Sequence, residues 1–520
     1  MVLNLPKLPE DVLLEILGNL DFKDLISCKV ACKTLNKAID DSVALQYSIE
    51  LAACGMVDGL CPHPEGLDST IGERLRQLRL YDMAWRQLRW AKQETLTHLV
   101  GFYVSTTLSR NLCRSDDVLV FLAGGSKALL QRTPSILRGV QETHLEVSFQ
   151  DSQYCEALVD YSQNLLIWTD RSIRCHHLRT LSTGETHPLA CNRGVLNTGR
   201  AVGITGICGD YLLEDAVYGS NVRVWNWKTG NSVYEIVRSH PYATDSPWLF
   251  LDPRFTISKS NRYQEPSDQE SVGLRIIRFR EEESGPEDLI RPAGQSYIFL
   301  LPEFLQHRET EFSCNVSPWR SASPWASGYF HTDPAHRVFS VDVYYRVDTV
   351  QSLTFHIPAH TFLSCIASLP ATVESTVRVP WNQWGPLGSR VIPRPTRQLK
   401  GALVQGARAA IIMLPSLDIA PTVTVFDYHP QRVARALARQ RNGDNDTTIV
   451  RGGTIAENGM DVVETKLSCI VQEVPVPGKL MEMMTSEAMF RVDTMLCEDG
   501  IVIIEEDEMN MVAGAWAYTI

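Results

Sequence analysis

Residues 8–20 read LPEDVLLEILGNL, from Leu8 to Leu20, and this stretch is the strongest structural signal in the chain. Its apolar residues recur one, three and four positions apart, which places them on one stripe of an α-helix. They are Val12, Leu13, Ile16, Leu17 and Leu20. Pro9 suits the first helical turn, where its missing N–H group would have no partner. Glu10 and Asp11 lie near the positive end of the helix dipole. The stretch therefore predicts an amphipathic helix.

Two more helices are predicted directly after it. Asp21 can cap a second helix that has Asp24 in its first turn. That helix continues through Leu25, Ile26 and Val30, and a third begins near Thr34 and carries Leu35, Ala38 and Ile39. Three helices in roughly forty residues form a core that is too small to be comfortably stable alone. We therefore expect a partner to cover the apolar surface that remains.

The order of these residues resembles the F-box motif. The matching positions are Leu8-Pro9, Leu13 with Ile16-Leu17, Leu20-Asp21, Leu25, and Val30 with Cys32-Lys33. The sequence departs from the pattern at its end, where the family often has Trp and this chain has Leu35, in an apolar position. The alternative interpretation is an ordinary helical hairpin that packs on its own domain.

The resemblance implies that the F-box docks on the SKP-type adaptor subunit of a cullin–RING (SCF-type) ubiquitin ligase. The adaptor contacts that it implies are Leu8, Pro9, Leu13, Ile16, Leu17, Leu20, Leu25 and Val30. These would form an apolar surface of the helix-in-groove kind. Some of these residues must instead build the small core of the F-box, and the sequence does not divide the two groups.

Composition narrows the possible partners and compartments. The formal net charge of −12 over 520 residues argues against general binding to nucleic acid or to an anionic membrane surface. No apolar stretch is long enough for a transmembrane helix, and the first residues lack the pattern of a secretory signal. The 13 cysteines are scattered without a Cys-x-x-Cys pair, which indicates reduced thiols and a cytoplasmic or nuclear protein.

The next fifty residues predict two further helices. Asp40 or Asp41 can cap the first and Gly55 can end it. Ser69 or Thr70 can start the second, whose likely inward positions in this interpretation are Leu75, Leu78, Met83, Trp85 and Leu88. Its arginines favour a solvated helix face over a nucleic-acid contact. Residues 47–59 and the helix after them also resemble the linker that follows the F-box in many fungal (basidiomycete) F-box proteins.

From about residue 95 the pattern changes to short β-branched and aromatic runs separated by Gly, Pro, Asn and Asp. An internal echo lies within it. Ser182-Thr183-Gly184-Glu185 and Lys228-Thr229-Gly230-Asn231 each follow a candidate strand, HHLRTL at 176–181 or VRVWNW at 222–227, and precede another, HPLA at 187–190 or SVYEIV at 232–237. This spacing resembles the blades of a WD-repeat-like propeller. Six or seven blades would fit the length, and another β-rich assembly is the alternative.

These patterns predict an α+β multidomain protein. A small helical F-box with the helix after it would occupy residues 1–54, and a helical linker residues 55–94. A large all-β domain, a degenerate β-propeller that binds the substrate, would occupy residues 95–520.

The sequence offers no pattern of a catalytic, cofactor-binding or metal site. Nucleophile-elbow, phosphate-loop, dinucleotide and zinc-protease motifs are missing. His176 and His177 would point to opposite faces of a strand, so they could not easily share one ion. Tryptophans are better candidates, as anchors that hold a target protein, and packing inside the β-rich core is the alternative role for each of them. They are Trp225, Trp227, Trp248, Trp319, Trp325, Trp381 and Trp384.

We therefore expect a non-catalytic substrate receptor: the F-box docks the adaptor, and through it a cullin, while the β-domain holds an unidentified target protein. This chain would then carry two binding sites, one for the adaptor and one for the target. Together they would raise the effective concentration of the target near the transferring enzyme. The alternative, from another functional class, is a propeller-type enzyme or scaffold with an N-terminal helical appendage.

Overall fold

The computed structural model describes most of the chain between residues 8 and 519. The described ranges are 8–59, 70–88, 92–96, 100, 114–115, 118–123, 127–148, 155–170, 173–199, 202–216, 221–237, 248–260, 272–280, 293–306, 310–320, 328–346, 350–370, 375–393, 403–413, 422–443, 448–450, 453–457, 461–476, 491–506 and 512–519.

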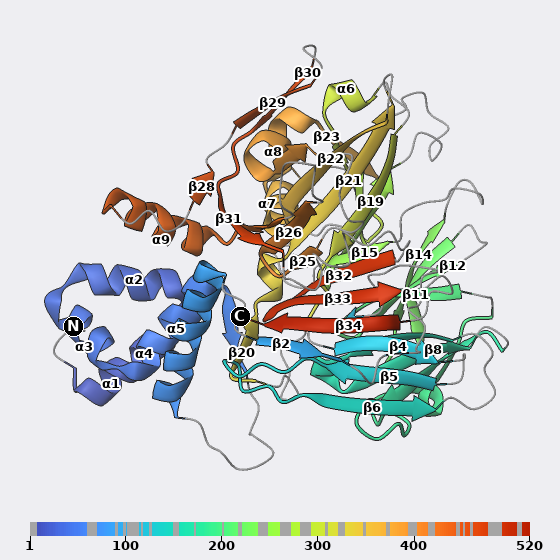
Figure 1. The fold of residues 1–520 in the computed structure, drawn as a ribbon, viewed down its shortest axis with the longest axis horizontal. Coiled ribbons are helices and arrows are strands. Elements are labelled where there is room, and N and C mark those ends of the chain that lie inside the picture. The colour runs from blue at the N-terminus through green and yellow to red at the C-terminus, as the bar shows by residue number, and fades with distance from the viewer. Residues whose placement is uncertain are drawn as a thin grey trace.

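In the described part of the chain, five helices precede a large β-domain and project from one side of it (Figure 1). They are α1 (Glu10–Gly18), α2 (Phe22–Ala31), α3 (Lys33–Asp41), α4 (Val43–Cys54) and α5 (Ile71–Gln87). Among the described residues of the β-domain there are four further helices: α6 (Glu303–Gln306), α7 (Ala359–Ser368), α8 (Trp381–Gly388) and α9 (Pro430–Arg441). Among the described helices, none combines the length and the hydropathy that crossing a membrane requires.

Local capping sets the ends of the N-terminal helices. The Asp21 side chain accepts a hydrogen bond of 2.9 Å from the backbone N–H of Asp24, as predicted for α2. Thr70 caps α5, and Gly55 ends α4 with a φ of 62°, a left-handed conformation that favours glycine. The cap of α4 is Ser42 and neither Asp40 nor Asp41, so that prediction was wrong: α3 continues through both aspartates.

Seven sheets of four or five strands form the described β-domain and make it a seven-bladed β-propeller. Blade 1 contains β3 (Arg114–Ser115), β4 (Val118–Ala123), β5 (Lys127–Arg132) and β6 (Thr143–Ser148). Blade 2 contains β7 (Cys155–Asp160), β8 (Leu165–Asp170), β9 (Cys175–Thr180) and β10 (Val195–Asn197). Blade 3 contains β11 (Val202–Cys208), β12 (Tyr211–Ala216), β13 (Asn221–Asn226) and β14 (Asn231–Val237).

The remaining blades carry additions to the four-stranded pattern. Blade 4 contains β15 (Leu249–Asp252), β16 (Phe255–Ser260), β17 (Gly273–Arg278), β18 (Ser296–Leu300) and, parallel to it, β23 (Thr376–Val379). Blade 5 contains β19 (Thr310–Val316), β21 (Val338–Arg346), β22 (Val350–Pro358) and β24 (Arg390–Pro393). Blade 6 contains β25 (Leu403–Gln405), β26 (Arg408–Met413), β27 (Thr422–Asp427), β31 (Cys469–Pro475) and β28 (Thr448–Val450).

The last blade joins the two ends of the ring. Blade 7 contains β32 (Arg491–Cys497), β33 (Gly500–Glu506), β34 (Val512–Thr519) and β2 (Lys92–Thr95). Because β2 precedes blade 1 in the sequence and pairs antiparallel with β34, the two ends of the β-domain close the ring together. Two small sheets lie outside the blades: β1 (Met56–Asp58) with β20 (Phe330–Thr332), and β29 (Gly453–Glu457) with β30 (Asp461–Thr465).

The hydrophobic core is a series of layers between neighbouring blades. Leu130 of blade 1 and Leu166 of blade 2 belong to one layer, and the next layer joins blade 2 to blade 3 through Trp227. The cluster between blades 6 and 7 also takes in buried residues of α4 and α5, such as Leu51 and Tyr81. Helices α4 and α5 therefore share the core of the propeller.

The internal echo marked two real blades, with one error. SVYEIV lies within β14, as expected, but the outer strand of blade 2 is β10 and not HPLA at 187–190. Instead, the His187 ring contacts the ring of Trp227, with the two centroids 5.1 Å apart. A 3₁₀ turn (Cys191–Gly194) then leads into β10. Pro188 lacks the N–H group that a ladder requires, which fits this exchange.

Candidate partner-binding site

The first three helices and the start of α4 form a separate unit with a core of its own, called here the N-terminal unit. Its fully buried residues are Leu13, Leu17, Leu25, Leu35, Ile39 and Leu45. Half-buried neighbours such as Leu14 and Leu20 pack against them. None of these buried residues belongs to the layers between the described blades. The small core therefore leaves much of the helical surface to solvent or to a partner.

The structure divides the predicted adaptor-contact residues into core and surface. Leu13, Leu17 and Leu25 are buried in the core of the N-terminal unit. Outside that core, Leu8, Ile16 and Leu20 are half-buried, whereas Pro9 and Val30 are exposed. This division is what the sequence alone could not supply.

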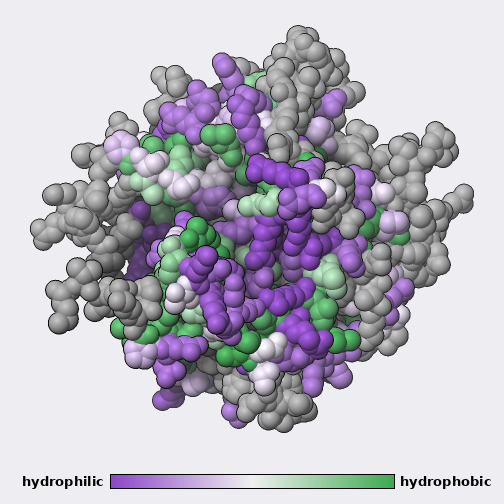
Figure 2. Space-filling model, turned by 90° about the vertical axis from the view of Figure 1, so that its left-hand side faces the viewer, coloured by the Kyte–Doolittle hydropathy of each residue, from purple (hydrophilic) through white to green (hydrophobic). Residues whose placement is uncertain are grey.

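Two exposed valines contribute apolar surface to the N-terminal unit. Val30 on α2 is 81% exposed and Val12 on α1 is 43% exposed. Val12 lies on the predicted apolar stripe, but the motif does not single it out. The side of the molecule that carries these helices has small hydrophobic groups among hydrophilic residues (Figure 2). Exposed aliphatic side chains on helices gain free energy when a partner groove covers them.

The two thiols of this unit have structural roles. Cys32 precedes α3, and its Sγ atom accepts a contact of 3.5 Å from the backbone N–H of Leu35. Cys28 packs half-buried against the small core. Across the described residues, no group of three or more His, Cys, Asp or Glu side chains is arranged to hold a metal ion.

Helices α4 and α5 and strand β1 connect this unit to the propeller through buried polar contacts. Tyr81 and Trp85 of α5 both donate to the backbone carbonyl of Glu498, the indole at 3.1 Å. Arg432 of α9 donates to the carbonyl of Cys54 at the end of α4. Strand β1 pairs with β20 through Met56 and Thr332. Because these contacts are buried and span several elements, we expect the N-terminal unit to keep a fixed orientation.

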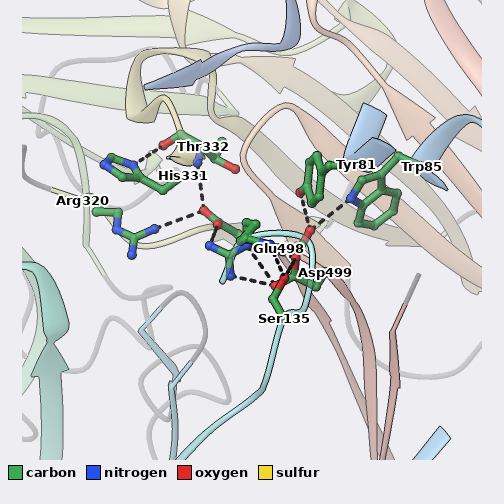
Figure 3. Close-up of polar contacts among 9 residues, drawn as sticks. Tyr81, Trp85, Ser135, Arg320, His331, Thr332, Glu498 and Asp499 are labelled. Atoms are coloured by element: carbon green, nitrogen blue, oxygen red, sulfur yellow. Dashed lines mark hydrogen bonds and ion pairs between the residues drawn. The ribbon is translucent and has the colours of Figure 1, made fainter. Parts of the chain in front are cut away.

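A buried ionic cluster lies beneath this junction (Figure 3). Fully buried Arg138, between β5 and β6, contacts Asp499 through Nε–Oδ1 at 2.9 Å and Nη2–Oδ2 at 2.7 Å. Its Nη1 atom also donates to Glu498. Ser135 donates to Asp499 at 2.7 Å, and Arg320 pairs with Glu498 at 3.3 Å. The cluster joins blades 1, 5 and 7 to the linker.

The charges in this cluster neutralise one another. Burial alone would raise the pKa of Glu498, but Arg138 and Arg320 outweigh it and lower that pKa to about 2. Burial and then Arg320 lower the pKa of nearby His331 to about 4, so the imidazole is neutral at pH 7. A carboxylate whose negative charge is stabilised by two arginines is a poor general base. The arrangement therefore fits a structural connection.

Three histidines that could in principle bind a metal ion have ordinary partners within the chain. His176 is buried, and its Nδ1 lies 3.0 Å from the Thr169 hydroxyl. The His177 ring stacks on Trp168, with centroids 4.8 Å apart. His336 lies 3.7 Å from Asp333 in an i, i+3 pair.

The tryptophans proposed as target anchors divide in the same way. Trp227, Trp248 and Trp384 are buried in the layers of the propeller, so they cannot reach a target protein without rearrangement. Trp225, Trp319 and Trp381 are half-buried, and Trp325 lies outside the described residues.

The ionic cluster around Glu498 was not predicted from the sequence, because its members are far apart along the chain.

Comparison with known proteins agrees with these two parts. Residues 5–45 match the F-box domain family. The chain therefore has an F-box domain followed by a seven-bladed β-propeller. A search of curated protein sequences found no match.

Several solved structures share a coarse similarity. Hsv2 of Kluyveromyces lactis is 8% identical, with 77% of this chain and 93% of that chain covered, and a TM-score of 0.35. The WD40 domain of SCAP from fission yeast is 9% identical, with 82% and 94% covered and a TM-score of 0.33. AztD from Citrobacter koseri is 10% identical, with 78% and 93% covered and a TM-score of 0.28. Because these scores are low, the seven-bladed arrangement rests on the strand pairing.

Proposed function

We propose that this protein is the substrate-recognition subunit of an SCF-type cullin–RING ubiquitin ligase. The N-terminal unit docks on the SKP-type adaptor and through it on a cullin. The propeller binds a target protein, and the assembly directs ubiquitin to that target. In this role the chain performs no bond chemistry.

The observation that carries the proposal is the apolar side-chain surface of the N-terminal unit. Pro9 at the N-cap of α1, Val12 on α1 and Val30 on α2 are exposed, although the unit already has a small core of six buried residues. Burial of such side chains is worth roughly 25 cal/mol per Å² of apolar surface. A helical partner groove is the usual solution for a surface of this kind. Leu8, Ile16 and Leu20, which are half-buried, would form the rim of the contact.

The fixed orientation of the N-terminal unit relative to the propeller is important for the proposed ligase function. A ligase of this kind works by proximity, so the target must be held at a defined place relative to the adaptor. The buried contacts of α4 and α5 with blades 6 and 7 supply that definition. A freely jointed linker would instead spread the target over many positions and lower its effective concentration.

The proposal extends to the organisation and location of the chain. We place the F-box and the following helix in residues 1–54, the linker in 55–94 and the target-binding domain in 95–520. The likeness of the linker to that of basidiomycete F-box proteins supports a fungal type of receptor. A cytoplasmic or nuclear location follows from the role.

A pull-down with a purified SKP-type adaptor tests the docking step. The full-length chain should retain the adaptor, and the double variant Val12→Asp/Val30→Asp should lose at least tenfold in affinity, because each charge would be buried unpaired. Both positions are exposed in the free chain, so the free energy of unfolding should change by less than about 0.5 kcal/mol.

The matched control places the same charge on an exposed leucine of the propeller. Leu387→Asp on α8 changes an exposed apolar side chain far from the N-terminal unit in the sequence and should leave adaptor binding intact. Equal retention of adaptor by wild type and by the double variant would refute the docking proposal. In that case the propeller enzyme or scaffold with a helical appendage becomes the better explanation.

A further inference from the structure

A groove between α5 and α9 is unusually rich in arginine. Helix α9 projects from blade 6 toward the side that carries α1–α5 (Figure 1). On α9, Arg432, Arg435 and Arg439 recur three and four positions apart, so they share one helix face. An open groove of about 490 Å³ lies between this face and α5. An inner cavity of about 20 Å³ shares four of its lining residues.

The lining carries more positive than negative charge, although the whole chain is acidic. Seven arginines line the groove and the inner cavity: Arg76, Arg79, Arg86, Arg408, Arg432, Arg435 and Arg439. Four carboxylates face them: Glu50, Asp82 and Asp427 in the lining, and Glu73 as the partner of Arg76. Three positive charges therefore remain in excess.

The carboxylates are already shared between arginines. Glu50 contacts Arg435 at 2.7 Å and Arg79 at 4.0 Å. Asp82 contacts Arg86 at 3.1 Å and Arg432 at 3.6 Å. Within the described part of the chain, no ion pair or hydrogen bond occupies the side chain of Arg439. The arginines thus compete for few acceptors, and an added anion would relieve that competition.

A buried donor without an acceptor faces the inner cavity. Arg408 is 5% exposed, and its Nη2 atom has no hydrogen-bond partner among the described residues. Its Nε atom lies 3.3 Å from Asp427, so only part of the guanidinium is satisfied. The Nε atom of Arg432, which is 8% exposed, makes no hydrogen bond either and has only the 3.6 Å ion pair with Asp82. Buried donors of this kind usually have an acceptor, such as a water molecule or a ligand oxygen.

From this geometry we propose that the groove binds a compact anion with two or more phosphoryl groups. Guanidinium forks match phosphate oxygens in geometry and charge. Each terminal phosphoryl group carries about 1.5–2 negative charges at pH 7, so two such groups match the excess of three. The groove volume falls in the range of small-molecule sites. Bound there, the anion bridges the linker helix and blade 6.

The same lining disfavours two larger ligands. Single-stranded nucleic acid uses open aromatic faces for stacking, but Arg408 covers Trp85, with the guanidinium carbon 4.1 Å from the ring centroid. An extended peptide uses free backbone groups at a strand edge. The walls of the groove are the sides of helices, whose backbone groups are bonded internally. The strands that line the inner cavity, β26, β27 and β31, are paired along both edges within blade 6. This inference does not depend on adaptor docking.

Calorimetric titration of the full-length chain with sodium tripolyphosphate at 0.15 M salt tests the proposal. We expect saturable binding at one site. Arg439→Gln should weaken it about tenfold, because a charge-assisted hydrogen bond is lost. The matched control is Arg441→Gln, an exposed arginine on the same helix that does not line the groove, and it should leave the affinity within twofold.

The other outcomes each count against the site. No saturable binding, or equal losses in the two variants, would overturn the proposal. A loss of less than twofold for Arg439→Gln would place the anion elsewhere. A glutamate-rich peptide or a single-stranded RNA is titrated in parallel. If either binds more tightly than tripolyphosphate and depends on Arg439, the groove serves a macromolecule instead. Adaptor pull-down of the same Arg439→Gln protein should be unchanged, which separates this failure from failure of docking.

Discussion

The N-terminal unit and the ionic cluster at its junction with the propeller differ in which side chains they expose to water. In the unit, apolar side chains such as Val30 remain in water on the outside of a small core. In the cluster, charged side chains such as Arg138 and Glu498 are fully removed from water. The first region exposes what a folded protein usually buries, whereas the second buries what it usually exposes.

This difference indicates which of the two regions we expect to bind another protein. The buried charges have partners within the chain, since Arg138 binds both Glu498 and Asp499 and Arg320 binds Glu498. The exposed valines on α1 and α2 have no comparable complement among the described residues. The cluster is thus complete as it stands, and the N-terminal unit is not. Mutations should separate the two regions by their effect on stability.

Loss of Arg138 should cause the largest effect. Arg138→Leu leaves Glu498 and Asp499 buried without their main counter-charge, and breaking a buried pair in this way costs about 3–5 kcal/mol. We expect the denaturation midpoint of the propeller, followed by tryptophan fluorescence, to fall sharply. The control is Arg76→Leu, which removes an exposed arginine of α5 and should not move that midpoint. A wild-type midpoint in Arg138→Leu would contradict the importance of the cluster.

A cavity in the N-terminal unit should have a smaller and more local effect. Leu17→Ala removes a fully buried side chain, a change that costs about 2–5 kcal/mol in well-packed cores. The cores are separate, so helical circular dichroism should report an early transition. Tryptophan fluorescence should keep its wild-type midpoint, because the first tryptophan of the chain is Trp85. A single shifted transition in both signals would show that the two regions unfold together.

The effect of pH on the free energy of unfolding through His331 should be smaller than the effects of these two substitutions. The pKa of His331 is lowered to about 4 in the folded protein, so the unfolded state, with an ordinary pKa near 6.5, binds the proton first. Its contribution is therefore lost as pH falls from about 7 toward 4, by roughly 2 kcal/mol between pH 7 and pH 5. Thermal unfolding of wild type and His331→Gln at both pH values measures it. The same pH dependence in the two proteins would refute this assignment.

Signals that act over a few residues could be predicted from the sequence. The caps Asp21 and Thr70 and the terminating Gly55 act within one turn of their helices, and the structure has them as expected. Ser42 was missed because two aspartates stood just before it. The Thr-Gly turns of blades 2 and 3 identified the propeller for the same local reason.

Signals that act over the whole chain could not be predicted. Arg138 meets Asp499 across 361 positions, and no pattern near either residue announces the other. Met83 was expected inside and is 40% exposed, whereas Tyr81 is fully buried. The reason is that α5 presents its Tyr81 side to β33 and to the turn at Glu498, which the helical period alone does not reveal. The seven-fold count likewise depends on pairings between distant strands.

The pairing of β2 with β34 has a consequence for synthesis. During translation β2 leaves the ribosome early, yet its hydrogen-bonding partner is the last strand described. Before residues 491–519 are made, blade 7 lacks three of its four strands, β32, β33 and β34, and the layers on either side of it are open to water. The N-terminal unit, with its own core, has no such wait. A nascent chain could therefore present its docking helices before its ring is closed, and chaperones would have to guard the open ring in that interval.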